Sequence, residues 1–460
     1  MNDNKFSSLS LQTAILDNLS SLGYHEMTEI QAKSLPAILK GQDVIGQGKT
    51  GSGKTAAFGL GLLNKLQVKK FRIQTLVLCP TRELADQVAK EIRKLARAIH
   101  NIKVLTLCGG TPFGPQVGSL EHGAHIIVGT PGRIEDHLGR GTLSLQHVDT
   151  LVLDEADRML DMGFVTALDN IVEKMPKQRQ TLLFSATFPQ QIQAIADRYL
   201  QSPALIKVEA SHQASSIAQH FYQVENDDDR LMAIRLLLLT HQPESSVIFC
   251  NTKIETQNVA NKLAAYGFSV VALHGDLEQR ERDQTLVRFA NKSASILVAT
   301  DVAARGLDIE ALDAVFNYHL AHDTEVHIHR IGRTGRAGST GYAFSLFSNK
   351  DSYKIGLLED NLGRQIEGEV LPNNQVLSES AFTAKMTTIQ IDGGKKQKVR
   401  AGDIVGALTG DNGIKFEQVG KIQLGANWAY VAVDKSVARK ALNKLSQGKL
   451  KGRKFRVREL

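Results

Sequence analysis

The sequence has few cysteines and no long apolar run. Its three cysteines, Cys79, Cys108 and Cys250, lie far apart and form no C-x-x-C pair, so we expect buried thiols in a reducing cytoplasm rather than disulfides. No apolar run approaches the roughly 18 residues of a membrane-spanning helix, which predicts no membrane association. Residues 1–10 lack the basic start and apolar core of a secretory signal. The fourteen histidines show no metal-ligand spacing. These absences favour a cytoplasmic protein without a structural metal.

Positive charge is unevenly distributed along the 460 residues. Residues 383–460 contain 17 Lys and Arg but only 6 Asp and Glu, a balance of +11, whereas the whole chain carries +7. The remainder of the chain is therefore net negative. A segment that supplies more than the whole positive balance indicates contact with a polyanion. The alternative is a merely solvated basic tail, but this segment is also patterned as a folded domain.

Apolar strands alternate with helical stretches from residue 30 to about 205. This alternation predicts a parallel sheet covered by helices on both faces, with functional residues where the strands end. After a polar stretch the pattern restarts, which predicts a second domain of similar architecture. The expected strands are 44–45, 75–79, 125–128, 150–153 and 181–184 in the first half, and 246–250, 269–273, 295–299 and 314–317 in the second.

The segment after residue 383 has a different pattern. It predicts the order β-α-β-β-α-β, which is the split βαβ arrangement of RNA-recognition modules. Ser436 is the expected N-cap of the second helix. The expected strands are 387–391, 419–424, 428–433 and 454–458, and the expected helices are 401–409 and 436–446.

Polar stretches divide the chain into three domains, which agrees with a prior of about 150 residues per domain. The expected fold class is α/β, with two parallel-sheet domains followed by a small α+β domain. The expected boundaries are 1–208 for the first domain, 209–219 for a linker, 220–368 for the second domain, 369–382 for a second linker and 383–460 for the third domain.

The segment Gly48–Thr55 fits the phosphate-binding pattern G-x-x-x-x-G-K-[ST]. Backbone N–H groups of such a loop surround a triphosphate, while the lysine reaches the β- and γ-phosphates and the last hydroxyl binds Mg²⁺. The pattern therefore predicts a bound nucleoside triphosphate with Mg²⁺. The predicted phosphate-binding residues are Gly51, Ser52, Gly53, Lys54 and Thr55.

Two carboxylates follow the apolar run that ends at Leu153. Asp154 at a strand end can hold Mg²⁺ together with Thr55, and Glu155 can orient or deprotonate the attacking water. Either pattern alone could be an accidental match. Both together, in this order and both on predicted strand ends, predict a nucleoside triphosphatase.

The first 370 residues resemble the DEAD-box family of ATP-dependent RNA helicases, which implies two tandem RecA-like domains. The residues after 383, including Ile391–Lys396 and Lys449–Val457, resemble the RNA-binding domain of the DbpA type. The family's usual Pro and Ala are replaced by Met27 and Gly48, without loss of a chemical group. The motifs that carry the likeness are Gly23-Tyr24 through Gln31, the phosphate-binding loop, Pro80–Leu84, Gly109-Gly110, Thr130–Arg133, Asp154–Asp157, Ser185–Thr187, Ala299-Thr300-Asp301 through Asp308, and His329–Arg336.

The resemblance implies roles around the nucleotide. Gln31 would read the adenine edge, because a side-chain amide offers both a donor and an acceptor. Tyr24 or Phe6 would pack near the ring, and Arg333 and Arg336 would act on the γ-phosphate as arginine fingers. The likeness also implies nucleotide contacts by Gly306 and Asp308, and coupling of closure to hydrolysis by Asp157, Ser185, Thr187 and His329.

RNA contacts of the two motor domains should go to the RNA backbone, since one surface must accept many sequences. In the C-terminal domain, Trp428 and Tyr430 share a face on which bases could stack, although Trp428 could equally belong to the core. The implied contacts are Arg82, Gly110, Thr130, Arg133, Gln279, Arg282 and Thr300 in the motor domains, and Lys395, Lys396, Trp428, Tyr430, Lys451 and Arg453 in the C-terminal domain.

The resemblance predicts an enzyme with a dedicated RNA target. We expect an ATP-dependent RNA helicase, a cytoplasmic monomer, whose C-terminal domain binds a hairpin of 23S rRNA near the peptidyl-transferase centre. It would remodel short duplexes of pre-50S particles during assembly of the large ribosomal subunit. The alternative is an ATP-gated RNA clamp without productive unwinding. DNA unwinding is disfavoured because the RNA module would then be misplaced.

Overall fold

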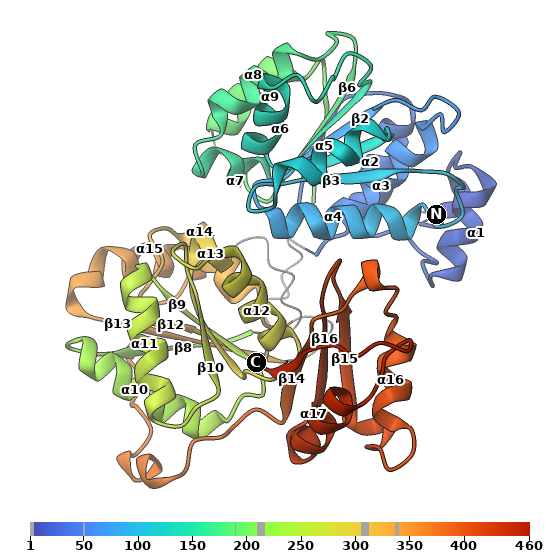
Figure 1. Ribbon diagram of the computed structural model, residues 1–460. Helices are drawn as coiled ribbons and strands as arrows, with labels where there is room; N and C mark the ends of the chain where they lie inside the picture. Colours follow the sequence, from blue (N-terminus) through green and yellow to red (C-terminus); the bar gives the residue numbers. More distant parts are fainter. Residues whose placement is uncertain (1–3, 49–50, 189, 209–216, 305–311, 336–339) are drawn as a thin grey trace. The chain divides into compact units, whose positions relative to one another are not determined.

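The structure is a computed structural model that describes all residues except 1–3, 49–50, 189, 209–216, 305–311 and 336–339 (Figure 1). It divides into two compact units, the first holding the described residues up to 208 and the second those from 217 onward, apart from the gaps given above. Within the described residues, no helix is both long and apolar enough to cross a membrane.

In its described part, the first unit is built on seven parallel strands in the order β3-β4-β2-β5-β6-β1-β7. The sequence predicted five of these strands but not β3 and β7. Those two lie at the edges of the sheet and are partly exposed, so neither has the continuous apolar run of a buried parallel strand. The strands are β1 Val44–Gln47, β2 Thr75–Leu78, β3 Val104–Leu107, β4 Ile126–Gly129, β5 Thr150–Asp154, β6 Gln180–Ser185 and β7 Ala204–Lys207.

Helices pack on both faces of this sheet (Figure 1). Adjacent residues of a strand point to opposite faces, so Val77 joins the core under α1 to α4, whereas Leu76 joins the core under α6 to α9. The helices are η1 Phe6–Ser8, α1 Thr13–Ser21, α2 Glu29–Leu39, α3 Lys54–Lys65, α4 Arg82–Leu95, α5 Phe113–Glu121, α6 Pro131–Gly139, α7 Ala156–Asp161, α8 Val165–Glu173 and α9 Gln190–Tyr199.

The second unit begins with a parallel sheet whose described strands run in the order β10-β11-β9-β12-β13-β8. Helices α10 and α11 share a core with one face of this sheet. The strands are β8 Ile217–Gln223, β9 Ser246–Cys250, β10 Val270–Leu273, β11 Ile296–Thr300, β12 Ala314–Asn317 and β13 Gly341–Phe347. The helices are α10 Asp227–His241, α11 Lys253–Ala265, α12 Gln279–Ala290, α13 Asp301–Ala304, α14 Thr324–Ile331, η3 Asn349–Asp351 and α15 Ser352–Leu362.

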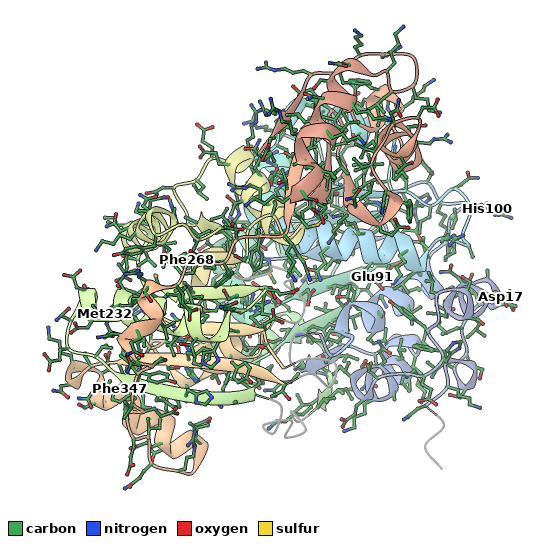
Figure 2. The ribbon with its side chains drawn as sticks, turned by 90° about the horizontal axis from the view of Figure 1, so that it is seen from below. Asp17, Glu91, His100, Met232, Phe268 and Phe347 are labelled. Carbon is green, nitrogen blue, oxygen red and sulfur yellow. The ribbon has the colours of Figure 1, made fainter. Side chains whose placement is uncertain are left out.

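Parts of both expected linkers are folded. Strand β8 starts at Ile217, inside the segment expected as the first linker, and pairs with β13 along seven residues. The segment 369–382 packs on the second parallel-sheet domain, where the ring of Phe382 lies 5.4 Å from that of Phe268 (Figure 2). It includes the short helix η4, Asn374–Ser378. Apolar residues within these polar stretches, such as Phe382, explain the difference.

The C-terminal domain has the predicted β-α-β-β-α-β order, with an antiparallel sheet in the order β15-β16-β14-β17. The expectation that Ser436 caps the last helix was wrong: α17 begins at Ala438, and Asp434 accepts a hydrogen bond from the Ser436 N–H one turn earlier. The elements are β14 Met386–Ile391, η5 Lys395–Gln397, α16 Ala401–Thr409, η6 Phe416–Gln418, β15 Val419–Leu424, β16 Ala429–Asp434, η7 Lys435–Val437, α17 Ala438–Gln447 and β17 Val457–Glu459.

The two faces of the C-terminal sheet have different partners. One face packs on α16 and α17 through an apolar core that includes Ile389 and Val431. The other face contacts α12 and the turn that follows it. There Gln284 donates a hydrogen bond to Gln390 at 3.1 Å, and Ser293 lies 2.6 Å from Thr388. Polar contacts therefore join this face to the second parallel-sheet domain.

Candidate active site

The phosphate-binding loop lies between β1 and α3. Gly51 and Gly53 have φ values of 82° and 96°, which only glycine adopts without strain. A Cβ atom on Gly53 would also lie 2.5 Å from the Gln31 side chain. The loop therefore leads into the N-terminus of a twelve-residue helix, where backbone N–H groups attract anions.

The side chains of this loop include donors of the kind that bind phosphate. The buried Lys54 ammonium donates a hydrogen bond to the carbonyl of Gly48 at 2.7 Å, and Thr55 stands in the first turn of α3. The buried Ser52 hydroxyl has no hydrogen-bond partner among the described residues. The predicted phosphate-binding residues from Gly51 to Thr55 are thus brought together.

The two carboxylates lie at the end of β5. Strand order places β6 between β5 and β1, so these carboxylates and the phosphate-binding loop leave the same edge of the sheet two strands apart. Asp154 accepts a hydrogen bond from the Glu155 N–H at 3.1 Å, and Glu155 adopts a left-handed conformation with φ 53°. This turn directs the chain from the strand into α7.

The charge of Asp154 is costly as the site stands. Burial raises the pKa of its carboxyl to about 7, and neighbouring Glu155 and Asp157 add to this, although the Lys54 ammonium opposes it. A divalent cation on this carboxylate would offset the cost. The donor set therefore fits Mg²⁺ held by Asp154 and Thr55, with ATP phosphates on the loop.

Asp157 connects this site to β6. Its Oδ2 accepts hydrogen bonds from the N–H and the hydroxyl of Thr187, at 3.1 and 2.9 Å. Although burial alone would raise the pKa of Asp157, these hydrogen bonds and Lys54 lower it below its ordinary value. Ser185, at the end of β6, is fully buried, and its hydroxyl has no hydrogen-bond partner within the described chain. The predicted coupling residues Asp157 and Thr187 are in direct contact.

The predicted adenine-binding residues are held by local contacts. Gln31 accepts a hydrogen bond from the Thr28 N–H and donates one to the carbonyl of Gly53, which ties α2 to the phosphate-binding loop. The Tyr24 hydroxyl donates to Glu91 of α4 at 2.9 Å. Phe6 is buried in the core beside α1 to α4. Gln31 thus lies next to the loop, while both rings have protein partners.

The predicted RNA contacts of the first unit gather at one edge of its sheet. Arg82, Gly110 and Thr130 follow β2, β3 and β4, which are neighbours in the order β3-β4-β2. Arg133, in the first turn of α6, donates a hydrogen bond to the carbonyl of Thr111 at 3.1 Å. Parallel topology therefore assembles these residues into one surface.

The second unit holds another group of predicted RNA contacts around α12. Arg282 donates a hydrogen bond to the carbonyl of Ala303 at 2.8 Å, and Thr300 accepts one from the Ala303 N–H. Gln279 begins α12 and donates to Asp283. These contacts join the helix to the end of β11.

The remaining predicted nucleotide residues belong to the second unit. Arg333 is buried directly after α14, and His329 stands within the last turn of that helix. Gly306, Asp308 and Arg336 lie outside the described residues.

Basic residues of the C-terminal domain gather beside Trp428. The N–H groups of Lys395 and Lys396 donate to the carbonyls of Gly425 and Ala426, so this lysine pair sits on the β15–β16 hairpin. A Cβ atom on Gly425 would lie 2.6 Å from the Trp428 indole, which shows that the ring covers the hairpin backbone. Both lysines are exposed, and Trp428 is half-buried.

The other predicted contacts of this domain differ in exposure. Tyr430 is 3% exposed on the face that meets α12, and burial raises the pKa of its hydroxyl. It would have to leave this contact to stack on a base. Arg453 is exposed, and Lys451 lies 3.4 Å from Asp403. The lysine pair and Trp428 are therefore accessible candidates at the β15–β16 hairpin, and Arg453 is a further exposed candidate.

Comparison with known families matches every domain. The DEAD/DEAH box helicase family matches residues 28–195, the helicase conserved C-terminal domain matches residues 229–338, and the DbpA RNA binding domain matches residues 388–459. The ATP-dependent RNA helicase DbpA of Escherichia coli K12 is 53% identical over 99% of both chains. The chain belongs to the DEAD-box ATP-dependent RNA helicases of the DbpA type.

Other DEAD-box helicases match mainly by their motor domains. CshA of Geobacillus kaustophilus is 42% identical over 79% of this chain and 77% of its own. A solved structure of S. cerevisiae Dbp5 bound to RNA and ADP BeF3 has a TM-score of 0.71 and 30% identity, and the match covers 81% of this chain and 97% of that chain. These likenesses confirm the predicted fold class and the helicase activity.

One arginine of this DEAD-box helicase was missed by sequence reasoning. Arg330 is almost fully buried, and its guanidinium makes a bidentate pair with Asp301 at 2.6 and 2.7 Å. It also donates to the carbonyl of His319. Both Asp301 and Arg330 lie within motifs that resemble the family, and this position could have identified them from the sequence. The pair locks α14 to the end of β11.

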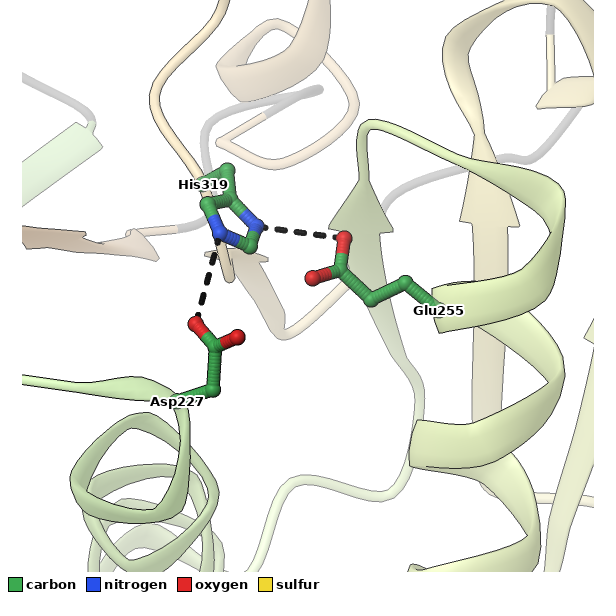
Figure 3. Close-up of side chains that lie close together, drawn as sticks. All are labelled: Asp227, Glu255 and His319. Atoms are coloured by element: carbon green, nitrogen blue, oxygen red, sulfur yellow. Dashed lines mark ion pairs between the residues drawn. The ribbon is translucent and has the colours of Figure 1, made fainter.

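A histidine of the helicase lies between two carboxylates (Figure 3). The Nδ1 atom of His319 is 3.2 Å from Glu255, and its Nε2 atom is 3.8 Å from Asp227. These three residues are the group within the described chain whose ligand atoms lie close enough for a metal ion. Each carboxylate faces a different ring nitrogen and Asp227 is exposed, so the three ligand atoms do not converge on one point. We assign this group no metal.

Proposed function

We propose that this DbpA-type helicase binds a hairpin of 23S rRNA through its C-terminal domain and remodels short RNA duplexes of pre-50S particles. The role would lie in assembly of the large ribosomal subunit in the cytoplasm. One observation carries the proposal: the exposed lysine pair, Lys395 and Lys396, is fastened to the hairpin that carries Trp428. Fixed cations beside an aromatic ring suit a structured RNA, because they contact phosphate and base together.

The nucleotide site supports an ATP-driven cycle. We propose that Lys54 and Thr55 bind the phosphates and Mg²⁺, that Asp154 is the other Mg²⁺ ligand, and that Glu155 accepts a proton from the attacking water. Bound Mg²⁺ would neutralise charge on the phosphates. The contact between Asp157 and Thr187 would transmit the state of the phosphate site to β6. Arg333 and Arg336 would stabilise the charge that develops on the γ-phosphate.

The mechanical step would be local remodelling. In our proposal, ATP and RNA together draw the two motor domains closed, and the bound strand bends and leaves its partner. Hydrolysis then reopens the domains and releases RNA. The proposed backbone contacts that hold the strand are Arg82, Gly110, Thr130, Arg133, Gln279, Arg282 and Thr300.

The second candidate is a nucleotide-gated RNA clamp that holds its target without productive unwinding. The same residues would bind RNA and ATP in both cases. The presence of both Lys54 and Glu155 in the chain favours turnover over a clamp.

ATP hydrolysis with different nucleic acids tests the target. The rate would be measured without nucleic acid, with bulk RNA, with DNA, and with an rRNA fragment that contains the peptidyl-transferase hairpin. We expect strong stimulation by the fragment, weak stimulation by bulk RNA and none by DNA. Equal stimulation by every RNA would contradict a dedicated target and leave a general RNA helicase. Displacement of a short strand next to the hairpin then separates helicase from clamp.

A further inference from the structure

A nearly fully buried ion pair lies within the candidate active site, and its arginine, Arg158, has no role in the cycle described so far. Arg158 Nη1 is 3.0 Å from Glu155 Oε2, and the two side chains are only 7% and 6% exposed. The residues are three apart across the start of α7, where the Arg158 N–H also donates to the Glu155 carbonyl. The left-handed turn at Glu155 and the helix that follows thus bring the two side chains together.

The pair is close but not aligned as a hydrogen bond. Neither Glu155 Oε2 nor Arg158 Nη1 has a hydrogen-bond partner among the described residues. Buried ion pairs that serve only stability normally have their donors and acceptors satisfied, because an unsatisfied buried charge is costly. Here the guanidinium fixes the carboxylate by charge and leaves an acceptor site on its oxygen. A carboxylate that must take a proton from water needs such a site.

Other charges make this restraint necessary. The Lys54 ammonium is close enough to affect both Asp154 and Asp157. Without a cation of its own, the Glu155 carboxylate would be drawn toward the lysine that must meet phosphate, or repelled by the neighbouring carboxylates. Arg158 supplies that cation from the side of α7.

We propose that Arg158 is a positioning residue that holds the Glu155 carboxylate in place for the attacking water. The inference rests on the proposed role of Glu155. In the step concerned, the water oxygen bonds to the γ-phosphorus, the bond from that phosphorus to the ADP oxygen breaks, and a water proton passes to Glu155. In this proposal Arg158 acts through Glu155, the carboxylate that its guanidinium contacts.

Kinetics of Arg158 variants in the full chain test this role. The kcat and KM for ATP would be measured at saturating RNA for Arg158→Met, Arg158→Gln and Arg158→Lys. We expect Arg158→Met to lower kcat by about tenfold to a hundredfold, since small misplacements of a catalytic group have effects of this order. KM for ATP should change by less than about twofold. Arg158→Lys should recover part of the loss, because it keeps the charge without the planar fork.

A matched control separates this effect from loss of any ion pair. Arg198 of the same unit lies 2.7 Å from Asp169 but is exposed, so Arg198→Met should keep normal kcat. Thermal unfolding and binding of a fluorescent ADP analogue would show whether each variant is folded. If Arg158→Met does not bind nucleotide, Arg158→Gln, which is neutral but polar, decides the test.

A double-variant cycle shows whether Arg158 acts through Glu155. We expect Glu155→Gln to abolish most turnover and to keep ATP-dependent RNA binding, and Arg158→Met to add no further loss in that background. An equal additional loss would mean independent action and would overturn the inference. Normal kcat in Arg158→Met and Arg158→Gln, with an inactive Glu155→Gln, would overturn it while preserving the role of Glu155. Normal turnover of Glu155→Gln would instead remove the proposed base.

Discussion

At the residue scale, the buried histidine His327 makes the second motor domain sensitive to acid. It is 2% exposed, and its Nε2 atom lies 3.3 Å from Gln219 of β8. Burial and then the nearby Arg330 lower the pKa of His327 from 6.5 to about 4. In the unfolded chain it would titrate near pH 6.5. The folded state thus favours the neutral ring, so its stability is full above pH 6.5 and falls as the pH drops toward 4.

Between pH 6.5 and 4, the free energy of unfolding should fall by about 1.4 kcal/mol per pH unit, or about 3 kcal/mol in total. Hydrogen exchange of peptides from α14 should show this loss of stability. The method reports on α14 locally, so it does not require that the three domains unfold in one step. In His327→Gln the dependence between pH 6.5 and 4 should flatten. The exposed His322 provides a control, and His322→Gln should keep the parent slope. Equal slopes in parent and His327→Gln would show that other groups cause the effect.

Sequence patterns named candidate residues for the nucleotide site, but they did not give the partners that these residues contact. Thr187 donates hydrogen bonds to Asp157 because both residues follow adjacent parallel strands, and the coupling role given to them stays a prediction. The pattern could not predict that Tyr24 would bond to Glu91, since α4 meets it only in the folded domain. Nor could it identify Arg158, because an arginine three residues after a glutamate in a helix usually indicates an exposed ion pair.

At the scale of elements, Gly394 allows the lysine turn to approach the hairpin of the C-terminal domain. A Cβ atom there would lie 2.5 Å from the carbonyl oxygen of Gly425 and 2.7 Å from the backbone nitrogen of Trp428. Backbone cannot give way as a flexible side chain can. We therefore expect Gly394→Ala to destabilise this domain by about 1–3 kcal/mol and to displace Lys395 and Lys396.

The chain has a single tryptophan, Trp428, so its fluorescence reports unfolding of this domain alone. Denaturant unfolding should show a lower midpoint for Gly394→Ala, and binding of the rRNA hairpin should weaken. Gly402 of α16 has open space around its Cβ position, so Gly402→Ala should be neutral or stabilising. Unchanged hairpin affinity in a destabilised Gly394→Ala would remove the lysine turn from the proposed RNA site.

Prediction of elements succeeded for most buried strands. It failed at edges and caps, and it also missed the buried strand β13, which lies between β12 and β8. Strand 314–317 was predicted with its observed bounds, because a central parallel strand has a continuous apolar run, here residues 314–316. The start of strand β8, residues 217–219, was read as linker, since its half-exposed edge position allows polar residues. Ser436 was expected as a cap on residue type alone, whereas Asp434 begins the turn one step earlier. Such choices depend on local geometry that several capping residues satisfy equally.

At the scale of the whole molecule, one face of the C-terminal sheet contacts the second parallel-sheet domain. The sequence had suggested that bases of RNA could stack on this face. Thr388 and Gln390 are polar and alternate with core residues, a pattern typical of a solvated or ligand-binding face. Both instead bond to the region of α12, and Tyr430 is buried beside them. The sequence alone does not show whether solvent, RNA or another domain covers such a polar sheet face. The positive charge that remains accessible near Trp428 becomes the basis of the last prediction.

That prediction concerns where RNA specificity resides. A chain shortened to residues 1–382 loses a segment of charge +11 and should keep weak ATPase stimulation by any RNA but lose preference for the rRNA hairpin. In the full chain, Lys395→Glu with Lys396→Glu should weaken hairpin binding at least about tenfold and reduce the salt dependence of log K by about 1–2. Arg439→Glu with Lys440→Glu changes charge equally on the exposed side of α17 and should have a smaller effect. If the shortened chain still prefers the hairpin, the specificity must lie in the motor domains.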